Sequence, residues 1–155
     1  MKHCLIRTGL CTPFLIAAAP LPSAKPLCST GDRACLVRTA TSYFDGILKA
    51  DGSKVPFAAH VRVTEQGEVM ATSRTEIVAA LKTTGATRAL RNMRMMADPA
   101  TGQVAVFVLS DVQIDGKQPF TVRRAQRMKI ERGLIQDVEI VLFKDDSPDA
   151  LWPDK

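Results

Sequence analysis

Few side chains in this sequence could perform acid–base chemistry. His60 is the only histidine beyond the first few residues, and Tyr43 is the only tyrosine of the chain. A histidine titrates near neutral pH, so it can accept or donate a proton. A buried tyrosine hydroxyl needs a polar partner and can donate to one. We take His60 and Tyr43 as candidate catalytic residues. The alternatives are an exposed surface histidine beside Ala59 and a tyrosine that only fills the core.

Charged residues near the end of the sequence form a second group. A tight turn predicted at Arg132-Gly133 places Arg127 opposite Glu139 on neighbouring strands. Opposite charges facing each other across two strands stabilise the sheet, so the two are either a structural pair or an anion-binding cation with a base. We include both as candidate catalytic residues. Three further side chains are candidate ligand-binding residues: Arg91, Asp111 and Glu65.

Other kinds of site are poorly supported by the residue pattern. One histidine and dispersed acidic residues do not make a set of metal ligands. The sequence has neither the Gly-x-Ser-x-Gly turn of a serine nucleophile nor a glycine-rich phosphate-binding loop. Its cations are not interleaved with aromatic residues, which argues against a nucleic-acid surface. We therefore expect no metal and no nucleic-acid partner.

The first 24 residues differ in kind from the rest. Lys2, His3 and Arg7 give a positive start, an apolar run covers residues 10–19, and small residues lead up to Ala24. This pattern is typical of a secretory signal peptide, and the apolar run is too short to span a bilayer as a permanent helix. We predict a periplasmic or secreted protein without stable membrane insertion.

Two of the four cysteines, Cys28 and Cys35, lie beyond this segment. In an exported domain, a single pair of cysteines indicates a disulfide bond. It would join an N-terminal arm, residues 25–32, to the first helix. A redox or nucleophilic role is the alternative, but the sequence has no Cys-x-x-Cys motif.

The spacing of apolar residues indicates the elements that position these side chains. Asp32 is a plausible N-cap for a helix over residues 33–50. A helical turn within 54–59 and a strand pair at 61–64 and 69–71 come next. The capping box Ser73-x-x-Glu76 then opens a second helix. Four longer strands follow: 86–97, 103–114, 118–131 and 134–143. This order predicts one α+β domain, 33–143, with helices on one face of a curved antiparallel sheet and a polar tail, 144–155.

Alternation along these strands predicts which face meets the helices. The inward set is Val104, Val106, Val108, Val122, Met128, Ile130, Leu134, Val138, Ile140 and Leu142. The outward set is Phe107, Leu109, Asp111, Arg123, Arg127, Lys129, Asp137, Glu139 and Val141.

Four local motifs point to a known family. They are Gly31–Leu36 with Tyr43-Phe44-Asp45, Val61–Gly67, Asp98–Ala105, and Arg127–Gly133. In order and spacing the sequence resembles the exported branch of SnoaL-like proteins, within the nuclear transport factor 2-like superfamily, from about residue 31 to 143. Two features depart from that pattern: Gln66 replaces an asparagine, and a Gly-Leu-Trp stretch is absent.

The resemblance implies a cone whose N-terminal helices and curved sheet enclose a pocket for a small apolar or aromatic oxygenated molecule. Relatives include cyclases, dehydratases, isomerases, epoxide hydrolases and lyases, usually without a metal or organic cofactor, and many are dimers. We therefore expect a cofactor-independent acid/base enzyme of lyase, isomerase or dehydratase type that forms a homodimer. One alternative is a non-catalytic module for small-molecule binding or dimerisation. Another is a cone filled by its own side chains, for which three methionines are suited: Met93, Met95 and Met96.

Overall fold

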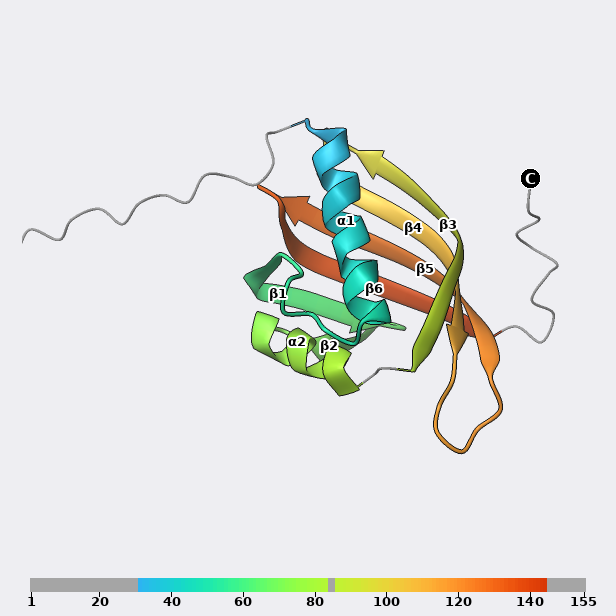
Figure 1. Ribbon diagram of the computed structural model, residues 1–155. Coiled ribbons are helices and arrows are strands. Elements are labelled where there is room, and N and C mark those ends of the chain that lie inside the picture. Colours follow the sequence, from blue (N-terminus) through green and yellow to red (C-terminus); the bar gives the residue numbers. More distant parts are fainter. Residues whose placement is uncertain (1–30, 84–85, 145–155) are drawn as a thin grey trace, which may run out of the picture.

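The computed structural model describes residues 31–83 and 86–144. They form two helices and six strands (Figure 1). The elements are α1 (Arg33–Leu48), β1 (Phe57–Glu65), β2 (Glu68–Ala71), α2 (Arg74–Thr83), β3 (Thr87–Asp98), β4 (Gln103–Val112), β5 (Phe120–Glu131) and β6 (Leu134–Lys144). The predicted signal peptide, most of the N-terminal arm and nearly all of the C-terminal tail lie outside the described residues.

The six strands form one curved sheet in the order β2-β1-β6-β5-β4-β3. Four of the five neighbouring pairs are antiparallel, whereas β1 runs parallel to β6. The sheet is therefore mixed, and the sequence-based expectation of a wholly antiparallel sheet was wrong at this one pairing. Helix α1 crosses the concave face of the sheet, and α2 packs beside β1 and β2 (Figure 1).

Helix α1 begins where the sequence predicts. The side chain of Asp32 accepts a hydrogen bond of 2.8 Å from the backbone N–H of Cys35, which satisfies one unpaired amide of the first turn. The helix ends at Leu48, two residues before the predicted end at residue 50. Its inner face buries Ala40, Tyr43 and Phe44. Full burial of an aromatic side chain contributes roughly 2 kcal/mol, so this face holds α1 against the sheet.

After α1 the chain makes a turn at Ser53-Lys54 and is extended from Phe57 onward, so the helical turn predicted within residues 54–59 was wrong. Phe57 and Ala58 are buried as the first residues of β1. The backbone N–H of Ile135 donates a 2.8 Å hydrogen bond to the carbonyl of Pro56, which holds the chain beside β6. Long-range pairing thus overrides the local preference at this point.

The core lies between α1 and the concave face. Val104, Met128 and Val138 occupy neighbouring positions on β4, β5 and β6, and none of them is exposed. They belong to the set that alternation predicts to face inward. Leu134 is the exception, because the register shifts after Lys129 and brings Ile135 opposite Ile130. Ile135 is therefore the fully buried residue, and Leu134 is only partly buried.

Two tight turns fix the register of the strands that carry the polar residues described below. Gln66-Gly67 joins β1 to β2, and Arg132-Gly133 joins β5 to β6, with positive φ at all four residues (53°, 85°, 53° and 79°). Successive positive φ values are characteristic of the hairpin turn that matches the twist of paired strands.

Candidate functional site

A cavity of about 350 Å³ lies between the concave face of the sheet and the two helices. Six of its apolar lining residues, drawn from both helices and from the sheet, are Ile47, Met70, Ile77, Phe120, Ile140 and Leu142. A mostly apolar hollow of this size with a few polar groups suits a small molecule. The described structure therefore does not match the alternative of a cone filled by its own methionines, because Met93, Met95 and Met96 are not among the lining residues.

Three side chains that can carry charge or transfer protons line this cavity: Tyr43, Glu65 and Arg124. They come from α1, from the end of β1 and from the middle of β5. Strand pairing sets their arrangement. Glu65 pairs with Ile140 of β6, which in turn pairs with Gln126 of β5. With strands about 4.8 Å apart, Glu65 and Gln126 are separated by about 10 Å across the sheet.

Tyr43 is 2% exposed and packs edge-on against Phe44 and Phe57, with ring centroids 5.5 and 6.0 Å away. Burial raises the pKa of its hydroxyl above the ordinary value. The nearby cation of Arg124 opposes this rise in pKa, whereas the carboxylate of Glu65 adds to it. Tyr43 thus stays neutral near pH 7 and can act as a proton donor toward the cavity.

Arg124 and Gln126 lie on the concave face, two residues apart on β5, so both point to the same side of the sheet. Nε of Arg124 and both amide atoms of Gln126 are buried, and within residues 31–83 and 86–144 none of these atoms has a hydrogen-bond partner. Gln126 is 4% exposed. Buried polar atoms of this kind are nearly always satisfied in folded proteins, so these atoms are available to a ligand.

The sequence analysis missed Arg124 and Gln126, although the signal was present. Alternation through Val122 and Met128 carries positions 124 and 126 onto the inward face. Polar side chains at two predicted core positions on one strand indicate either buried polar contacts or a site. Of the side chains predicted as catalytic or ligand-binding, Tyr43 and Glu65 are the two that line the cavity.

His60 lies elsewhere. It is exposed on β1, in the stretch where the pairing of β1 with β6 shifts register between Phe57 and Arg62, and it does not line the cavity. The structure therefore places His60 outside the cavity that Tyr43 lines, which matches the alternative of an exposed surface histidine. Strand alternation is the physical reason, because His60 precedes the buried Val61 and therefore points to the face opposite to Val61 and Val63.

Four further candidate residues also lie away from the cavity, on the convex face: Arg91, Asp111, Arg127 and Glu139. Nε of Arg127 is 2.9 Å from Glu139, directly across β5 and β6, and its guanidinium also reaches Asp137 at 3.1 Å. Arg91 binds Asp111 through Nε and Nη2, at 2.8 and 2.9 Å. These contacts match the structural alternative for Arg127 and Glu139. The pairing of Arg91 with Asp111 was not predicted.

The contacts of the convex face also shift the pKa values of the residues concerned. The hydrogen bond from Arg91 lowers the pKa of Asp111, and a hydrogen bond from Thr121 lowers it further. The hydrogen bond to Glu139 raises the pKa of Arg127. Asp111 and Arg127 are therefore held in their charged forms and engaged in ion pairs, so we do not assign proton transfer to these pairs.

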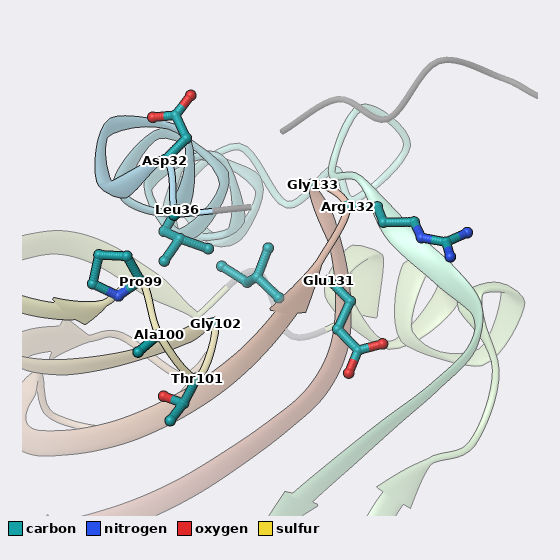
Figure 2. Close-up of a pocket in the computed structure, with 11 residues that line it drawn as sticks. Asp32, Leu36, Pro99, Ala100, Thr101, Gly102, Glu131, Arg132 and Gly133 are labelled. Carbon is teal, nitrogen blue, oxygen red and sulfur yellow. The ribbon is translucent and has the colours of Figure 1, made fainter. Parts of the chain in front are cut away.

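A second hollow, of about 230 Å³, lies at the other end of α1 between the β3–β4 and β5–β6 turns. Figure 2 shows the carboxylates of Asp32 and Glu131 and the guanidinium of Arg132 directed away from it, while Leu36 points inward. Asp32 is already engaged as the N-cap of α1. We therefore place the candidate chemistry in the larger cavity.

Residues 31–83 and 86–144 contain neither a metal-binding cluster nor a membrane-spanning helix. No group of three or more histidine, cysteine, aspartate or glutamate side chains is arranged to hold a metal ion. No helix there combines the length and apolar character needed to cross a membrane.

Comparison with known families gives a match over most of the chain. The protein-family model described as "Domain of unknown function (DUF8021)" matches residues 29–142. The chain belongs to the DUF8021 family. No curated protein matches the DUF8021 chain in sequence.

Solved structures show the fold to which this DUF8021 domain belongs. A protein of unknown function with a cystatin-like fold from Methylobium petroleophilum PM1 is 22% identical, with a TM-score of 0.57 over 79% of this chain and 83% of that one. A proposed SnoaL-like polyketide cyclase from Jannaschia sp. CCS1 is 12% identical, with a TM-score of 0.59 over 71% and 86%. An LEH-like epoxide hydrolase from M. tuberculosis is 11% identical, with a TM-score of 0.61 over 72% and 85%.

These likenesses confirm the predicted fold, the SnoaL-like and nuclear transport factor 2-like cone. The same fold is shared by proteins named as cyclases, isomerases and epoxide hydrolases, so it is an enzyme-like fold. Export, the homodimer and the Cys28–Cys35 disulfide stay predictions. Cys28 lies outside the described residues, and Cys35 is buried at the start of α1.

Proposed function

We propose that this DUF8021 protein is a cofactor-independent acid/base enzyme that acts on a small, mostly apolar oxygenated molecule held in the concave cavity. One observation carries the proposal: a tyrosine hydroxyl kept neutral by burial, a carboxylate and an arginine line one apolar cavity. Proteins of the same fold that are named as epoxide hydrolases and isomerases support enzymatic use of such a cavity. Because fold alone does not determine function, the weight rests on these side chains.

The three groups have complementary roles in an elimination or isomerisation. The carboxylate of Glu65 removes a proton from the substrate. The guanidinium of Arg124 stabilises the negative charge that develops on a substrate oxygen. The hydroxyl of Tyr43 donates a proton to the departing oxygen or to the rearranged product. The apolar walls limit the access of water, which strengthens the electrostatic contribution of Arg124.

The test is turnover of small aromatic oxygenated compounds, including lignin-type dimers, by the wild-type protein and two cavity variants. Positioned acid–base groups contribute about 10²–10⁴-fold to rates, so Tyr43→Phe and Glu65→Gln should each lower kcat by a factor in this range. Each replacement keeps the size of its side chain, and melting followed by circular dichroism checks that the fold is retained.

His60→Ala is the matched control, because His60 is exposed and outside the cavity. Its turnover should equal that of the wild-type protein. A loss of activity in this variant with full activity in the Tyr43 and Glu65 variants would contradict the proposed site. Tight binding without turnover of any compound would instead assign the cavity to carriage of a ligand.

A further inference from the structure

The arginines of the sheet differ in what their Nε atoms contact. On the convex face, Nε and Nη2 of Arg91 bind the two oxygens of Asp111, and the same two atoms of Arg127 bind Glu139 and Asp137. On the concave face, Nε of Arg124 is buried and has no partner in the described part of the chain. The Nε atom, which binds a carboxylate in Arg91 and Arg127, has no such contact among the described residues in the cavity-lining Arg124.

A guanidinium with a buried, unpaired Nε has a clear preference among ligands. Arginine is charged at all ordinary pH values, and its Nε–Nη edge matches the two oxygens of a carboxylate. A partly buried cation without a counter-ion is costly, whereas a neutral oxygen compensates only part of that cost. An anionic group with two oxygens is therefore the best partner for Arg124.

Gln126 supplies a second donor beside it. It lies two residues along β5 on the same face, and its amide nitrogen and oxygen are both buried without a partner among the described residues. Gln126 pairs with Ile140, which lines the cavity, but Gln126 itself is not among the lining residues and its amide lies behind the cavity wall beside Arg124.

The charges that line the cavity determine the orientation of a bound ligand. Glu65 lies on β1 and Arg124 on β5, with β6 between these two strands. Among the described residues, Glu65 and Arg124 do not form an ion pair with each other. A negatively charged group is therefore attracted to the β5 side and repelled from the β1 side, and the apolar remainder of the ligand lies against the helices.

We infer that the cavity selects small apolar carboxylic acids, with the carboxylate bound by the guanidinium of Arg124 and with the buried amide of Gln126 beside that guanidinium. This inference rests on the proposed function in that the same cavity is the active site, and it adds the class of substrate. In this arrangement Arg124 both holds the carboxylate and stabilises charge that develops on it.

The experiment compares two probes of nearly identical shape, 3-phenylpropionate and 3-phenylpropionamide, by isothermal titration calorimetry at pH 7. A hydrogen bond to a charged group is stronger than a neutral one, so we expect wild-type protein to bind the carboxylate about 10- to 100-fold more tightly than the amide. The Arg124→Gln variant should lose this preference. Arg127→Gln, which removes a cation from the convex face, should keep it.

A second variant tests the same point without removing the arginine. Gln126→Glu places a carboxylate beside Arg124 in a side chain of the same size, so it should compete with the bound acid. We expect weaker binding of 3-phenylpropionate and little change for the amide. Circular dichroism and thermal melting show whether each variant is folded.

Equal affinity of wild-type protein for acid and amide, or no binding of either, would overturn the inference. So would a carboxylate preference that persists in Arg124→Gln. These outcomes can be distinguished from failure of the proposed function, because binding is measured without turnover. A carboxylate preference without any turnover would support the inference and contradict the enzyme. Turnover of neutral compounds that depends on Tyr43 and Glu65, without a carboxylate preference, would support the proposed enzyme and contradict the inference.

Discussion

At the scale of single residues, the environment of Tyr43 matters more than its identity. Aromatic rings surround it, and two opposite charges act on its hydroxyl from Glu65 and Arg124. Sequence reasoning could identify Tyr43 as a candidate, because it is the only tyrosine on a predicted inner helix face. It could not identify its partners, since these come from strands that meet α1 only in the folded chain.

The unique tyrosine makes its ionisation directly measurable. Burial raises the pKa of Tyr43, so the folded protein should show less tyrosinate absorbance near 295 nm at pH 10 than an exposed tyrosine, which is half ionised there. Because the folded-state pKa is the higher one, the stabilising contribution is complete below the ordinary pKa and is lost as pH rises above it. The signal should therefore appear together with unfolding. A half-maximal tyrosinate signal at pH 10 in the folded protein would contradict this burial.

A residue-scale prediction at low pH concerns Asp98 in the β3–β4 turn. Hydrogen bonds from the Thr101 hydroxyl (2.7 Å) and the Ala100 backbone N–H (2.9 Å) lower its pKa. A lowered folded-state pKa gives stability that is present above the ordinary aspartate pKa and is lost as pH falls through the folded value. Urea unfolding from pH 7 to pH 3 should show this loss, and Asp98→Asn should make it shallower. An unchanged pH profile in that variant would exclude a contribution from Asp98.

At the scale of elements, helix starts were predicted well because their signals are local. Asp32 caps α1, and the backbone N–H of Glu76 lies 3.3 Å from the hydroxyl of Ser73 at the start of α2. The start of β1 was missed because burial of Phe57 depends on β6, far along the chain. The face of Leu134 was misassigned because alternation alone does not reveal a register shift.

The N-cap of α1 provides the corresponding test. Asp32→Ala removes the acceptor for the Cys35 N–H, and the loss of a cap typically costs about 1 kcal/mol. We expect the free energy of unfolding in urea to fall by about this amount, with turnover and ligand binding unchanged because Asp32 is remote from the larger cavity. Asp32→Asn retains an acceptor oxygen and should lose much less. Equal losses in both variants would show that charge, and not the cap, is responsible.

At the scale of the whole molecule, the sequence predicted the cone and its helix-covered face but only part of the site. Of the candidate residues, Tyr43 and Glu65 line the cavity and His60 lies outside it, whereas Arg124, which also lines the cavity, was not among the candidates. The difference has a physical cause. Alternation assigns residues to a face, whereas a cavity depends on where the curved sheet moves away from its helices, and no local pattern encodes that separation.

The parallel pairing of β1 with β6 has a consequence for how the protein is made. Strands β3, β4 and β5 pair with strands adjacent in the sequence, and so does β1 with β2, whereas the pairing of β1 with β6 joins segments far apart in the chain. Contacts between distant parts of a chain form slowly, because a large loop must close first. Glu65 is aligned with Ile140 only after that closure. We therefore expect the β1–β6 pairing to form late in folding, so that Glu65 and Arg124 come to line one cavity only when β1 has docked on β6.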